Sequence, residues 1–452
     1  MSTLDIAQKP RLLRVGLCVA CGLLVLVGLL LVLGAARPMV DSESASVLLP
    51  STLQEGQPEE FPIITDNVAQ TTGRVAISGD CVAFRGQGGE VYLHNLTTGE
   101  TVTITDTEDV PHKVAISQGV VVLRSDRLEE RGVWGYYDPH CSDAGPFTST
   151  EVITPFHIVG RTHAHYPALS GEIPTFDTWA PKGWWYIAAV ELDADDDGIP
   201  DAIQPGYPVG YPENQDIIIP LSWPYWQGER GQQISDVYWD DEYRIACWYD
   251  NGRGVDSVQC NDLFHLDDPE PWRYCFTVTD STWIPVDYKG FLAVHRDLVV
   301  WHDGRDSPLS GLDVYIADLD LDDDGILNHD DPTPGEGPAI FPLVNRPGDQ
   351  LYPDIWWPFA VWADWRNGNQ ADIYAYDLSL DSDGDGVPNW RDPDRPCIDP
   401  AEIRITSDPA EQTTPEMWGC TVVWKDKRNG NWEIYGTYLC RCYMPIIMHQ
   451  FP

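Results

Sequence analysis

The sequence predicts an all-β fold made of repeated four-stranded units, and three observations lead to that prediction. The chain is rich in aromatic residues, with 19 Trp and 20 Tyr, and in turn-forming residues, with 37 Pro and 38 Gly. After the N-terminus it has no long run with helical periodicity, so short strands joined by turns are expected. A strand–turn–strand pattern also recurs along the 452 residues, a length that suits one large repeat array.

The N-terminal segments are expected to set the cellular compartment. Residues 1–14 place three basic side chains before the uncharged run 15–36, which is a transmembrane anchor or a signal peptide. The run is longer than the roughly 20 residues that a helix needs to span a bilayer, and the positive charges predict a cytoplasmic N-terminus. We therefore expect an extracellular protein anchored at the cell surface, or a secreted one if cleavage occurs near Ala36. Residues 37–66 are expected to form a linker.

The repeated unit is clearest in residues 361–376. An apolar strand ends at Trp362, the sequence Arg-Asn-Gly-Asn at 366–369 forms a turn, and a strand around Tyr374 returns. Asn-Gly between alternating apolar residues is a strong hairpin signal, because both residues tolerate a positive φ. Seven such units are recognised by the position at which the apolar strand ends: 84, 123, 179, 248, 301, 362 and 424.

The spacing of these units predicts a β-propeller. Successive units lie 39 to 69 residues apart, and one four-stranded blade takes about 40–50 residues, so the longer intervals contain insertions. A single unit cannot bury both of its faces, and radial stacking solves this problem. We predict a propeller over residues 67–440, followed by a tail at 441–452. Seven blades are expected, and the degenerate units in the middle leave six or eight as alternatives.

The same segments resemble the TolB-type propeller repeat, which runs Ser-Gly-Asp, two apolar residues and Trp, Arg-Asn-Gly-Asn, Asp-Ile-Tyr and Asp-Leu. The sixth and seventh units match this pattern closely, the first and fifth in part, and the third and fourth weakly. The resemblance covers about residues 67–440. It implies a propeller in a periplasmic or surface setting, and it implies no particular reaction.

Three acidic loops share a second template, Asp-x-Asp-x-Asp-Gly followed by an apolar residue at position seven. Oxygen ligands at positions 1, 3, 5, 7, 9 and 12 with Gly at position 6 form the spacing that wraps a chain around Ca²⁺. The predicted ligands are Asp193, Asp195, Asp197, Ile199 and Asp201 in the first loop, Asp320, Asp322, Asp324, Ile326, Asn328 and Asp331 in the second, and Asp381, Asp383, Asp385, Val387, Asn389 and Asp392 in the third. The loops are similar to those of dockerins and thrombospondin type 3 repeats, where Asp serves at position 12. Gln204 stands there in the first loop, so that site is expected to be weaker or to be closed by another residue.

Ca²⁺ is the predicted cofactor of these loops. Extracellular modules typically bind it at ~10⁻⁴–10⁻³ M, so the sites would be filled outside a cell and would act as structural staples. Without the ion, the neighbouring carboxylates would repel one another. Mg²⁺ is disfavoured because it resists an all-protein cage. The alternative is that the Asp residues only cap turns.

Charge and cysteine content restrict the partners and the compartment. A net charge of −43 argues against nucleic acid, whose phosphates need Lys and Arg, and against an anionic lipid surface. Nine of the eleven Cys lie outside the apolar run, and in an exported chain disulfides are expected. Cys247 and Cys260 flank a predicted hairpin and can pair across it. The odd count leaves one Cys free or intermolecular.

No catalytic residue is predicted. Neither the Gly-x-Ser-x-Gly motif of serine peptidases nor His-Glu-x-x-His is present. One hypothesis is an interaction module that presents loops to an extracellular protein or glycan. The other is a polysaccharide-active enzyme, a lyase or hydrolase, with its site at the propeller channel. Titratable side chains clustered in that channel would favour the enzyme, and apolar and backbone groups would favour the binding module.

Overall fold

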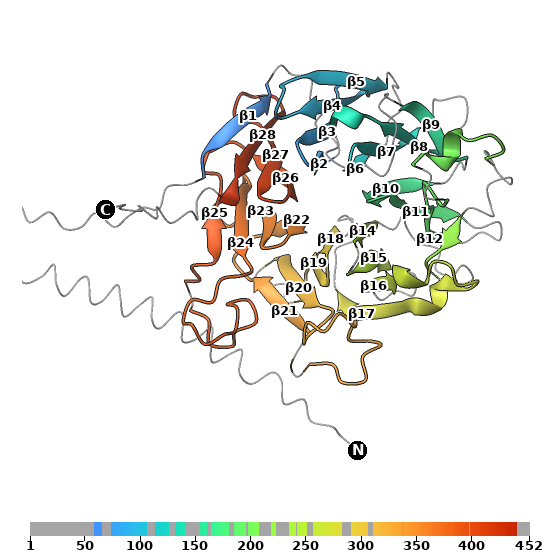
Figure 1. Cartoon of the computed structure of the whole chain (residues 1–452). Helices are drawn as coiled ribbons and strands as arrows, with labels where there is room; N and C mark the ends of the chain where they lie inside the picture. The colour runs from blue at the N-terminus through green and yellow to red at the C-terminus, as the bar shows by residue number, and fades with distance from the viewer. Residues whose placement is uncertain are drawn as a thin grey trace, which may run out of the picture. The chain divides into compact units, whose positions relative to one another are not determined.

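A computed structural model describes residues 58–65, 74–105, 114–125, 132–141, 153–160, 164–179, 185–195, 198–207, 218–222, 235–240, 242–250, 256–282, 291–305, 311–335, 337, 339–396 and 398–440. The strands belong to one compact unit, Gln57–Pro393 with Pro400–Pro452. Within this unit they form seven four-stranded antiparallel sheets arranged around a central opening (Figure 1). The predicted seven-bladed propeller is therefore confirmed.

The segments predicted to anchor the chain and to end it, residues 15–36 and 441–452, lie outside the described residues. Among the residues that are described, none of the helices has the length and apolar character needed to cross a bilayer.

Blades are numbered along the chain, and each is given from its innermost strand outward. Blade 1 contains β2 (Ala76–Ser78), β3 (Cys81–Arg85), β4 (Val91–Asn95) and β5 (Thr101–Thr105). Blade 2 contains β6 (Val114–Ser117), β7 (Val120–Ser125), β8 (Gly132–Tyr137) and β9 (Ile153–Val159). Blade 3 contains β10 (His165–Ser170), β11 (Ile173–Trp179), β12 (Trp185–Ala189) and β13 (Ile219–Pro220). Blade 4 contains β14 (Ser235–Trp239), β15 (Arg244–Asp250), β16 (Asp256–Asp262) and β17 (Cys275–Thr282).

The remaining blades follow the same order. Blade 5 contains β18 (Leu292–His295), β19 (Leu298–Asp303), β20 (Asp313–Asp318) and β21 (Ile340–Val344). Blade 6 contains β22 (Gln350–Trp356), β23 (Phe359–Asp364), β24 (Asp372–Asp377) and β25 (Glu402–Arg404). Blade 7 contains β26 (Gln412–Trp418), β27 (Thr421–Asp426), β28 (Glu433–Tyr438) and β1 (Glu60–Ile64). The described 3₁₀ helices are η1 (Pro139–Cys141), η2 (Asp201–Ile203), η3 (Leu263–His265) and η4 (Pro271–Tyr274).

The first strand of the chain closes the ring. β1 pairs antiparallel with β28, with Pro62 opposite Tyr435, and so forms the outer strand of blade 7. Residues 60–64, expected in the linker 37–66, are therefore part of the propeller. Pro62 obscures the strand in the sequence, because Pro cannot donate to a sheet and is tolerated only at its edge. The outer position of β1 is such an edge.

Large side chains fill the space between neighbouring blades. Trp248, Trp301, Trp362 and Trp424 lie on the second strands of blades 4 to 7, and each is at most 1% exposed. The second strands β19 and β23 are buried along their whole length, because an adjacent blade covers each face of the sheet. These Trp residues are four of the seven strand ends from which the repeat was recognised.

The Arg-Asn-Gly-Asn turn belongs to a structural motif that holds the buried Trp. Trp362 Nε1 donates to Oδ2 of Asp364 at 2.8 Å, and the backbone N–H of Arg366 donates to Oδ1 of Asp364 at 2.8 Å. The guanidinium of Arg366 pairs with Asp364 and lies 4.2 Å from the ring centroid of Tyr374. The equivalent residues are Trp301, Asp303, Arg305 and Tyr315 in blade 5, and Trp424, Asp426, Arg428 and Tyr435 in blade 7. The motif therefore serves the fold.

The Ser-Gly-Asp segment links neighbouring blades. Ser78 Oγ, at the end of β2, accepts a hydrogen bond from the backbone N–H of Gln118 in the next blade at 3.0 Å. Ser117 Oγ, at the end of β6, accepts the corresponding bond from Gly171 at 3.0 Å. At the ends of the innermost strands, each serine hydroxyl therefore accepts a hydrogen bond from a backbone N–H in the turn of the following blade.

Three disulfides reinforce the described blades. Cys247 and Cys260 face each other across β15 and β16, with their Cα atoms 4.1 Å apart, so the predicted pair is confirmed. Cys81–Cys141 joins blade 1 to η1 after β8 in blade 2, and Cys420–Cys440 lies within blade 7. Cys397 and Cys442 lie outside the described residues.

Candidate functional site

The three acidic loops occupy the same place in three blades. They connect the third strand to the fourth: β12 to β13 in blade 3, β20 to β21 in blade 5, and β24 to β25 in blade 6. A backbone N–H just after each third strand donates to a carbonyl in the turn between the first and second strands, in the pairs Leu192–Glu172, Leu319–Asp297 and Leu378–Pro358. All three loops therefore begin on the propeller face at which the innermost strands end.

One hydrogen bond defines the bend of every loop. The Asp at position 1 accepts from the backbone N–H of the Gly at position 6, in the pairs Asp193–Gly198 at 2.8 Å, Asp320–Gly325 at 2.7 Å and Asp381–Gly386 at 2.8 Å. These glycines have φ of 78°, 86° and 91°, a region that other residues rarely adopt. The conformation therefore explains why the template has Gly at position 6.

A second pair of bonds closes each loop at position 9. Its side-chain oxygen accepts from the backbone N–H of position 2, in the pairs Asp201–Ala194 at 3.0 Å, Asn328–Leu321 at 3.0 Å and Asn389–Ser382 at 2.8 Å. Its own N–H donates to the residue before position 1, in the pairs Asp201–Leu192, Asn328–Leu319 and Asn389–Leu380. In this structure the position-9 side chains hold the loop backbone, and their role as ligands stays a prediction.

Carboxylates converge in the second and third loops. One oxygen from each of Asp320, Asp322 and Asp324 lies within 4.8 Å of the others, and the same holds for the triad Asp381, Asp383 and Asp385. Both triads could hold a metal ion, because carboxylate oxygens at positions 1, 3 and 5 are hard ligands of the kind Ca²⁺ prefers. In the first loop Asp193 is buried and Asp195 is exposed, but Asp197 lies outside the described residues.

The remaining predicted ligands lie at positions 7 and 12. Gln204 Nε2 donates to the carbonyl of Ile199 at 3.3 Å, so in the first loop the neutral amide at position 12 closes onto position 7. Asp331, at position 12 of the second loop, is 9% exposed and accepts from the N–H of Thr333 at 2.7 Å. Asp392 is also buried. The roles of the Ile326 and Val387 carbonyls stay predictions.

The electrostatics of the second and third loops reflect crowded acids and donated N–H groups. Desolvation and the carboxylates of Asp324, Asp331 and Asp320 raise the pKa of Asp322. Backbone N–H groups of Gly386 and Gly384 lower the pKa of Asp381. Position 1 of the third loop is therefore stabilised as a carboxylate. At position 3 of the second loop desolvation and like charge both destabilise the carboxylate, and a bound cation would relieve the repulsion between like charges.

The second loop is tied to both neighbouring blades. Tyr243, in blade 4, donates its hydroxyl to Asp320 Oδ2 at 2.9 Å. Arg391, in the third loop, forms an ion pair with the buried Asp318, which directly precedes the second loop. A cation in the second loop would therefore act on contacts between blades 4, 5 and 6.

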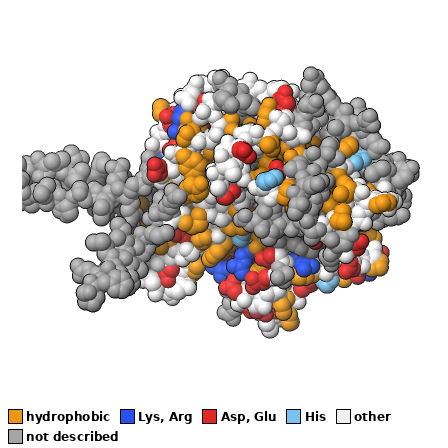
Figure 2. Space-filling view, turned by 45° about the horizontal axis from the view of Figure 1, so that its top comes forward, with side chains coloured by type: hydrophobic (Ala, Val, Ile, Leu, Met, Phe, Trp, Pro, Cys, Tyr) orange, Lys and Arg blue, Asp and Glu red, His pale blue; other side chains and the backbone are white. Residues whose placement is uncertain are grey.

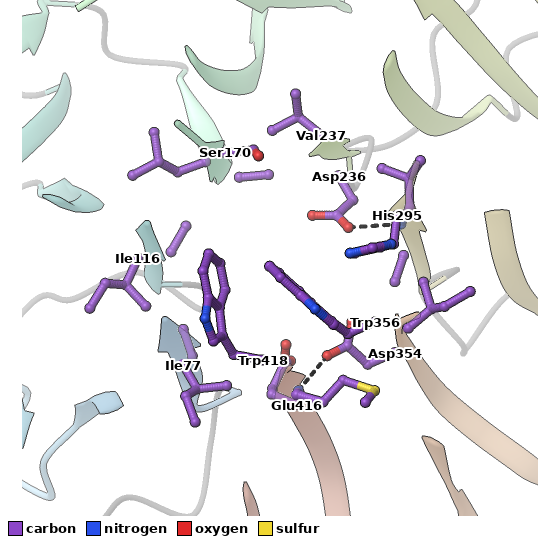
Figure 3. A pocket seen from close by; sticks show the side chains of 18 of the residues that line it. Ile77, Ile116, Ser170, Asp236, Val237, His295, Asp354, Trp356, Glu416 and Trp418 are labelled. Carbon is purple, nitrogen blue, oxygen red and sulfur yellow. Dashed lines mark hydrogen bonds between the residues drawn. The ribbon is translucent and has the colours of Figure 1, made fainter. Parts of the chain in front are cut away.

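The central opening contains a cavity of about 110 Å³, lined by residues of all seven innermost strands (Figure 3). Most lining side chains are Ala, Val, Leu and Ile, and the acids that line it are Asp236, Asp354 and Glu416. Asp354 accepts from the backbone N–H of Met417 at 2.7 Å, and Asp236 accepts from Val294 at 3.0 Å. These carboxylates accept hydrogen bonds from the backbone of the next blade, as the hydroxyls of Ser78 and Ser117 do in blades 1 and 2.

Charge in the cavity is partly compensated. Glu416 forms an ion pair with Arg74. Burial raises the pKa of Asp354 to about 6, and burial lowers the pKa of His295 to about 3. This group of residues was not predicted from the sequence. The available signal was the last position of the innermost strand, where Ser in the early blades is replaced by His295, Trp356 and Trp418 in the late ones.

The fold and the loops define a class: a seven-bladed β-propeller with acidic loops on one face. No protein-family model and no curated protein matches the chain. Similar solved structures include the tricorn protease, with a TM-score of 0.47 and 12% identity over 90% of this chain and 35% of that one. Puromycin hydrolase has a TM-score of 0.46 and 12% identity over 83% of this chain and 53% of its own. TolB from Acinetobacter baumannii has a TM-score of 0.37 and 12% identity over 70% and 62%.

The chain thus spans about a third of the length of the tricorn protease chain and about half of puromycin hydrolase. Likeness at this level assigns no activity to the chain.

Proposed function

We propose that the protein is an extracellular binding module, a β-propeller stapled by Ca²⁺ that presents one face to a protein or glycan partner. The observation that carries the proposal is the shared geometry of the acidic loops. All three have the same bonds at positions 1, 2, 6 and 9. Two of them also bring three carboxylates together. An ordinary capped turn does not require such convergence, whereas a Ca²⁺ site does.

The channel supports binding rather than catalysis. Its lining is mainly apolar. Asp236 and Asp354 each accept a hydrogen bond from a backbone N–H, and Glu416 forms an ion pair. A glycoside hydrolase needs two carboxyl groups available for acid and base or nucleophile roles. The carboxylates here stabilise contacts between blades, so the polysaccharide-active enzyme is the less favoured candidate.

The proposed setting is the outside of a membrane, with the N-terminal run 15–36 as anchor or signal. The three disulfides support this setting, because such bonds persist in oxidising compartments. The acidic composition agrees with an exposed and soluble surface. On the face seen in Figure 2, acidic side chains are dispersed among hydrophobic and uncharged ones.

The deciding experiment is thermal unfolding of the purified chain in millimolar Ca²⁺ and in chelator. With a dissociation constant of ~10⁻⁴–10⁻³ M, 1 mM Ca²⁺ stabilises the folded state by about 0.4–1.4 kcal/mol for each site, so a rise in the melting temperature is expected. Asp322→Asn and Asp383→Asn should each reduce this rise. Asp323→Asn is the matched control, because it removes the same charge from position 4 of the second loop, where no ligand is predicted.

Equal melting temperatures in Ca²⁺ and in chelator would reject the calcium staples. Equal effects of Asp322→Asn and Asp323→Asn would show that only the net charge of the loop matters.

A further inference from the structure

Two histidines lie at the boundary between blades 4 and 5. His265 ends η3 in the connection from β16 to β17, and His329 lies in the second acidic loop, in the connection from β20 to β21. Both connections join the third strand of a blade to its fourth, so they share the face that carries the acidic loops. Neither histidine is a predicted ligand of Ca²⁺.

Each imidazole is stacked on an aromatic ring of blade 4. The centroids of His265 and Tyr274 lie 3.8 Å apart with an angle of 14° between the planes, and those of His329 and Phe276 lie 3.8 Å apart with an angle of 15°. Tyr274 and Phe276 are two residues apart where β17 begins, a separation of about 7 Å along a strand. The two imidazoles are therefore neighbours, although they belong to different blades.

A carboxylate accompanies each imidazole. His265 Nε2 lies 3.9 Å from Asp262 Oδ2, and His329 Nε2 lies 3.1 Å from Asp330 Oδ2. Burial lowers the pKa of His329, and the neighbouring Asp330 raises it. Asp262 and His265 in blade 4 act on the same imidazole. The four side chains thus form one electrostatic group across the blade boundary.

The spacing and chemistry of this group suit a tetrahedral metal ion. Ligand atoms bound at ~2.0–2.1 Å to a tetrahedral Zn²⁺ lie about 3.4 Å from one another, and the two pairs have separations of 3.1 and 3.9 Å. Each pair can therefore span one edge of the tetrahedron. Imidazole nitrogen binds Zn²⁺ and other transition metals, whereas Ca²⁺ takes oxygen ligands. Two carboxylates also match the charge of a divalent ion.

The exposed members of the group have room to turn toward an ion. The two pairs do not converge as the acidic triads do, so binding would draw them together. The side chains of His265 and Asp330 are 41% and 54% exposed. Asp262 is held in place, because its Oδ1 accepts from the N–H of Phe264 at the start of η3. That bond leaves Oδ2 for the ion.

We propose that this boundary binds a divalent transition metal such as Zn²⁺ through four ligands: Asp262, His265, His329 and Asp330. The ion would join η3 of blade 4 to the second acidic loop of blade 5. Its nitrogen ligands distinguish the site from the calcium sites, and it does not depend on them. The inference therefore goes beyond the proposed binding function and adds a second kind of staple, one that crosses a blade boundary.

Calorimetric titration of the full chain with ZnCl₂ tests the site. The chain carries no histidine tag, and millimolar Ca²⁺ is present throughout to occupy the acidic loops. We expect saturable binding of Zn²⁺. The variants His265→Ala and His329→Ala should each bind it at least about tenfold more weakly, because each lacks one of the four ligands.

His140→Ala is the matched control. His140 also lies beside a carboxylate, with its Nδ1 2.9 Å from Asp138 Oδ1, but it belongs to blade 2. This variant should bind Zn²⁺ as the native chain does. Zn²⁺ should also raise the melting temperature of the native chain in the same millimolar Ca²⁺, and it should do so less in the two variants at the boundary.

The melting curve of each variant without Zn²⁺ shows whether it is folded. The exposed His265 side chain contributes little to packing, so His265→Ala keeps the test decisive if His329→Ala is not folded. The proposal is overturned if Zn²⁺ does not bind, or if His265→Ala binds it as tightly as the native chain does. Failure of the calcium staples is recorded separately, as equal melting temperatures in Ca²⁺ and in chelator without Zn²⁺.

Discussion

The hydroxyl of Tyr243 lies 2.9 Å from Oδ2 of Asp320 and donates a hydrogen bond to it across the boundary between blades 4 and 5. Asp320 is wholly buried, and it also holds the N–H of Gly325 at position 6 of the second loop. The first carboxylate of the predicted ion site is therefore positioned by a neighbouring blade as well as by its own loop.

Tyr243→Phe should destabilise the fold by about 1 kcal/mol, the usual effect of losing one buried hydrogen bond. It should also reduce the Ca²⁺-dependent rise in melting temperature, because the position of Asp320 is less well fixed. The control is Tyr249→Phe, whose hydroxyl donates to the carbonyl of His302 at 2.8 Å, also between blades 4 and 5. Thermal unfolding should give both variants a similar loss in chelator. An equal calcium response in the two would contradict the coupling of Tyr243 to the loop.

Asp364→Asn tests the structural role of the Trp-x-Asp-x-Arg motif. Asp364 is wholly buried and pairs with Arg366, which is 16% exposed. Arg366 also pairs with Glu402 and so keeps one carboxylate partner. The expected loss in the free energy of unfolding is therefore about 2 kcal/mol, the usual contribution of hydrogen bonds to a charged group. Denaturant titration measures it, with Asp267→Asn at an exposed position as control. A loss no larger than that of the control would refute the role.

Removal of the Cys81–Cys141 bridge should destabilise the protein more than removal of Cys247–Cys260. The bridges span 60 and 13 residues, and the entropic cost of closing a loop in the unfolded chain grows with its length. The expected difference between the two double Cys→Ala variants is about 1 kcal/mol, measured by denaturant titration. Equal losses would show that chain entropy does not dominate.

Stability should fall as the solution is acidified below the ordinary histidine range, and buried His302 should contribute. Burial, together with Arg74, lowers the pKa of His302 to about 3 from 6.5, and neither ring nitrogen has a hydrogen-bond partner among the described residues. The unfolded chain therefore binds the proton more readily between pH 6.5 and 3, which costs up to about 1.4 kcal/mol for each pH unit.

Asp354 acts in the opposite direction. Its pKa is raised to about 6 from 3.8, so the folded state binds the proton more readily, and its contribution to stability is lost as the pH rises through 6.

The variant His302→Leu removes the buried imidazole, so it should flatten the loss of stability between pH 6.5 and about 4.5 in denaturant titrations. His140→Leu is the control, since the His140 side chain is 80% exposed. An unchanged slope in His302→Leu would contradict the assignment.

The blade count could be predicted because the residues buried between two blades form a short apolar run that ends in a large side chain, and this pattern is recognisable in the local sequence. A residue such as Trp301 or Trp424 ends the apolar run, and this pattern is retained where the rest of a unit is degenerate. Outer strands do not show this pattern, because they are less buried by neighbouring blades and tolerate more residue types. The two-residue β13 and the Pro-containing β1 were missed for this reason.

The acidic loops could be predicted in place and spacing, since their ligands are local in sequence. Two features were not predictable from the residues alone. The bond between Tyr243 and Asp320 joins positions 77 residues apart. The ring contacts of Trp356 with His295 and Trp418 depend on which strands become neighbours at the channel, and no periodicity within one strand reports that.

The pairing of β1 with β28 has a consequence for how the chain is made. Glu60, in β1, precedes all the other propeller strands, and Thr437, which lies opposite it, is synthesised only after the six blades between them. The ring therefore cannot close until β28, in the seventh blade, has left the ribosome, and contacts of such long range form slowly. During translation β28 is absent, so β1 offers unpaired backbone groups to any passing strand. Efficient biogenesis should thus depend on shielding this nascent segment, and shortened products lacking β28 should aggregate.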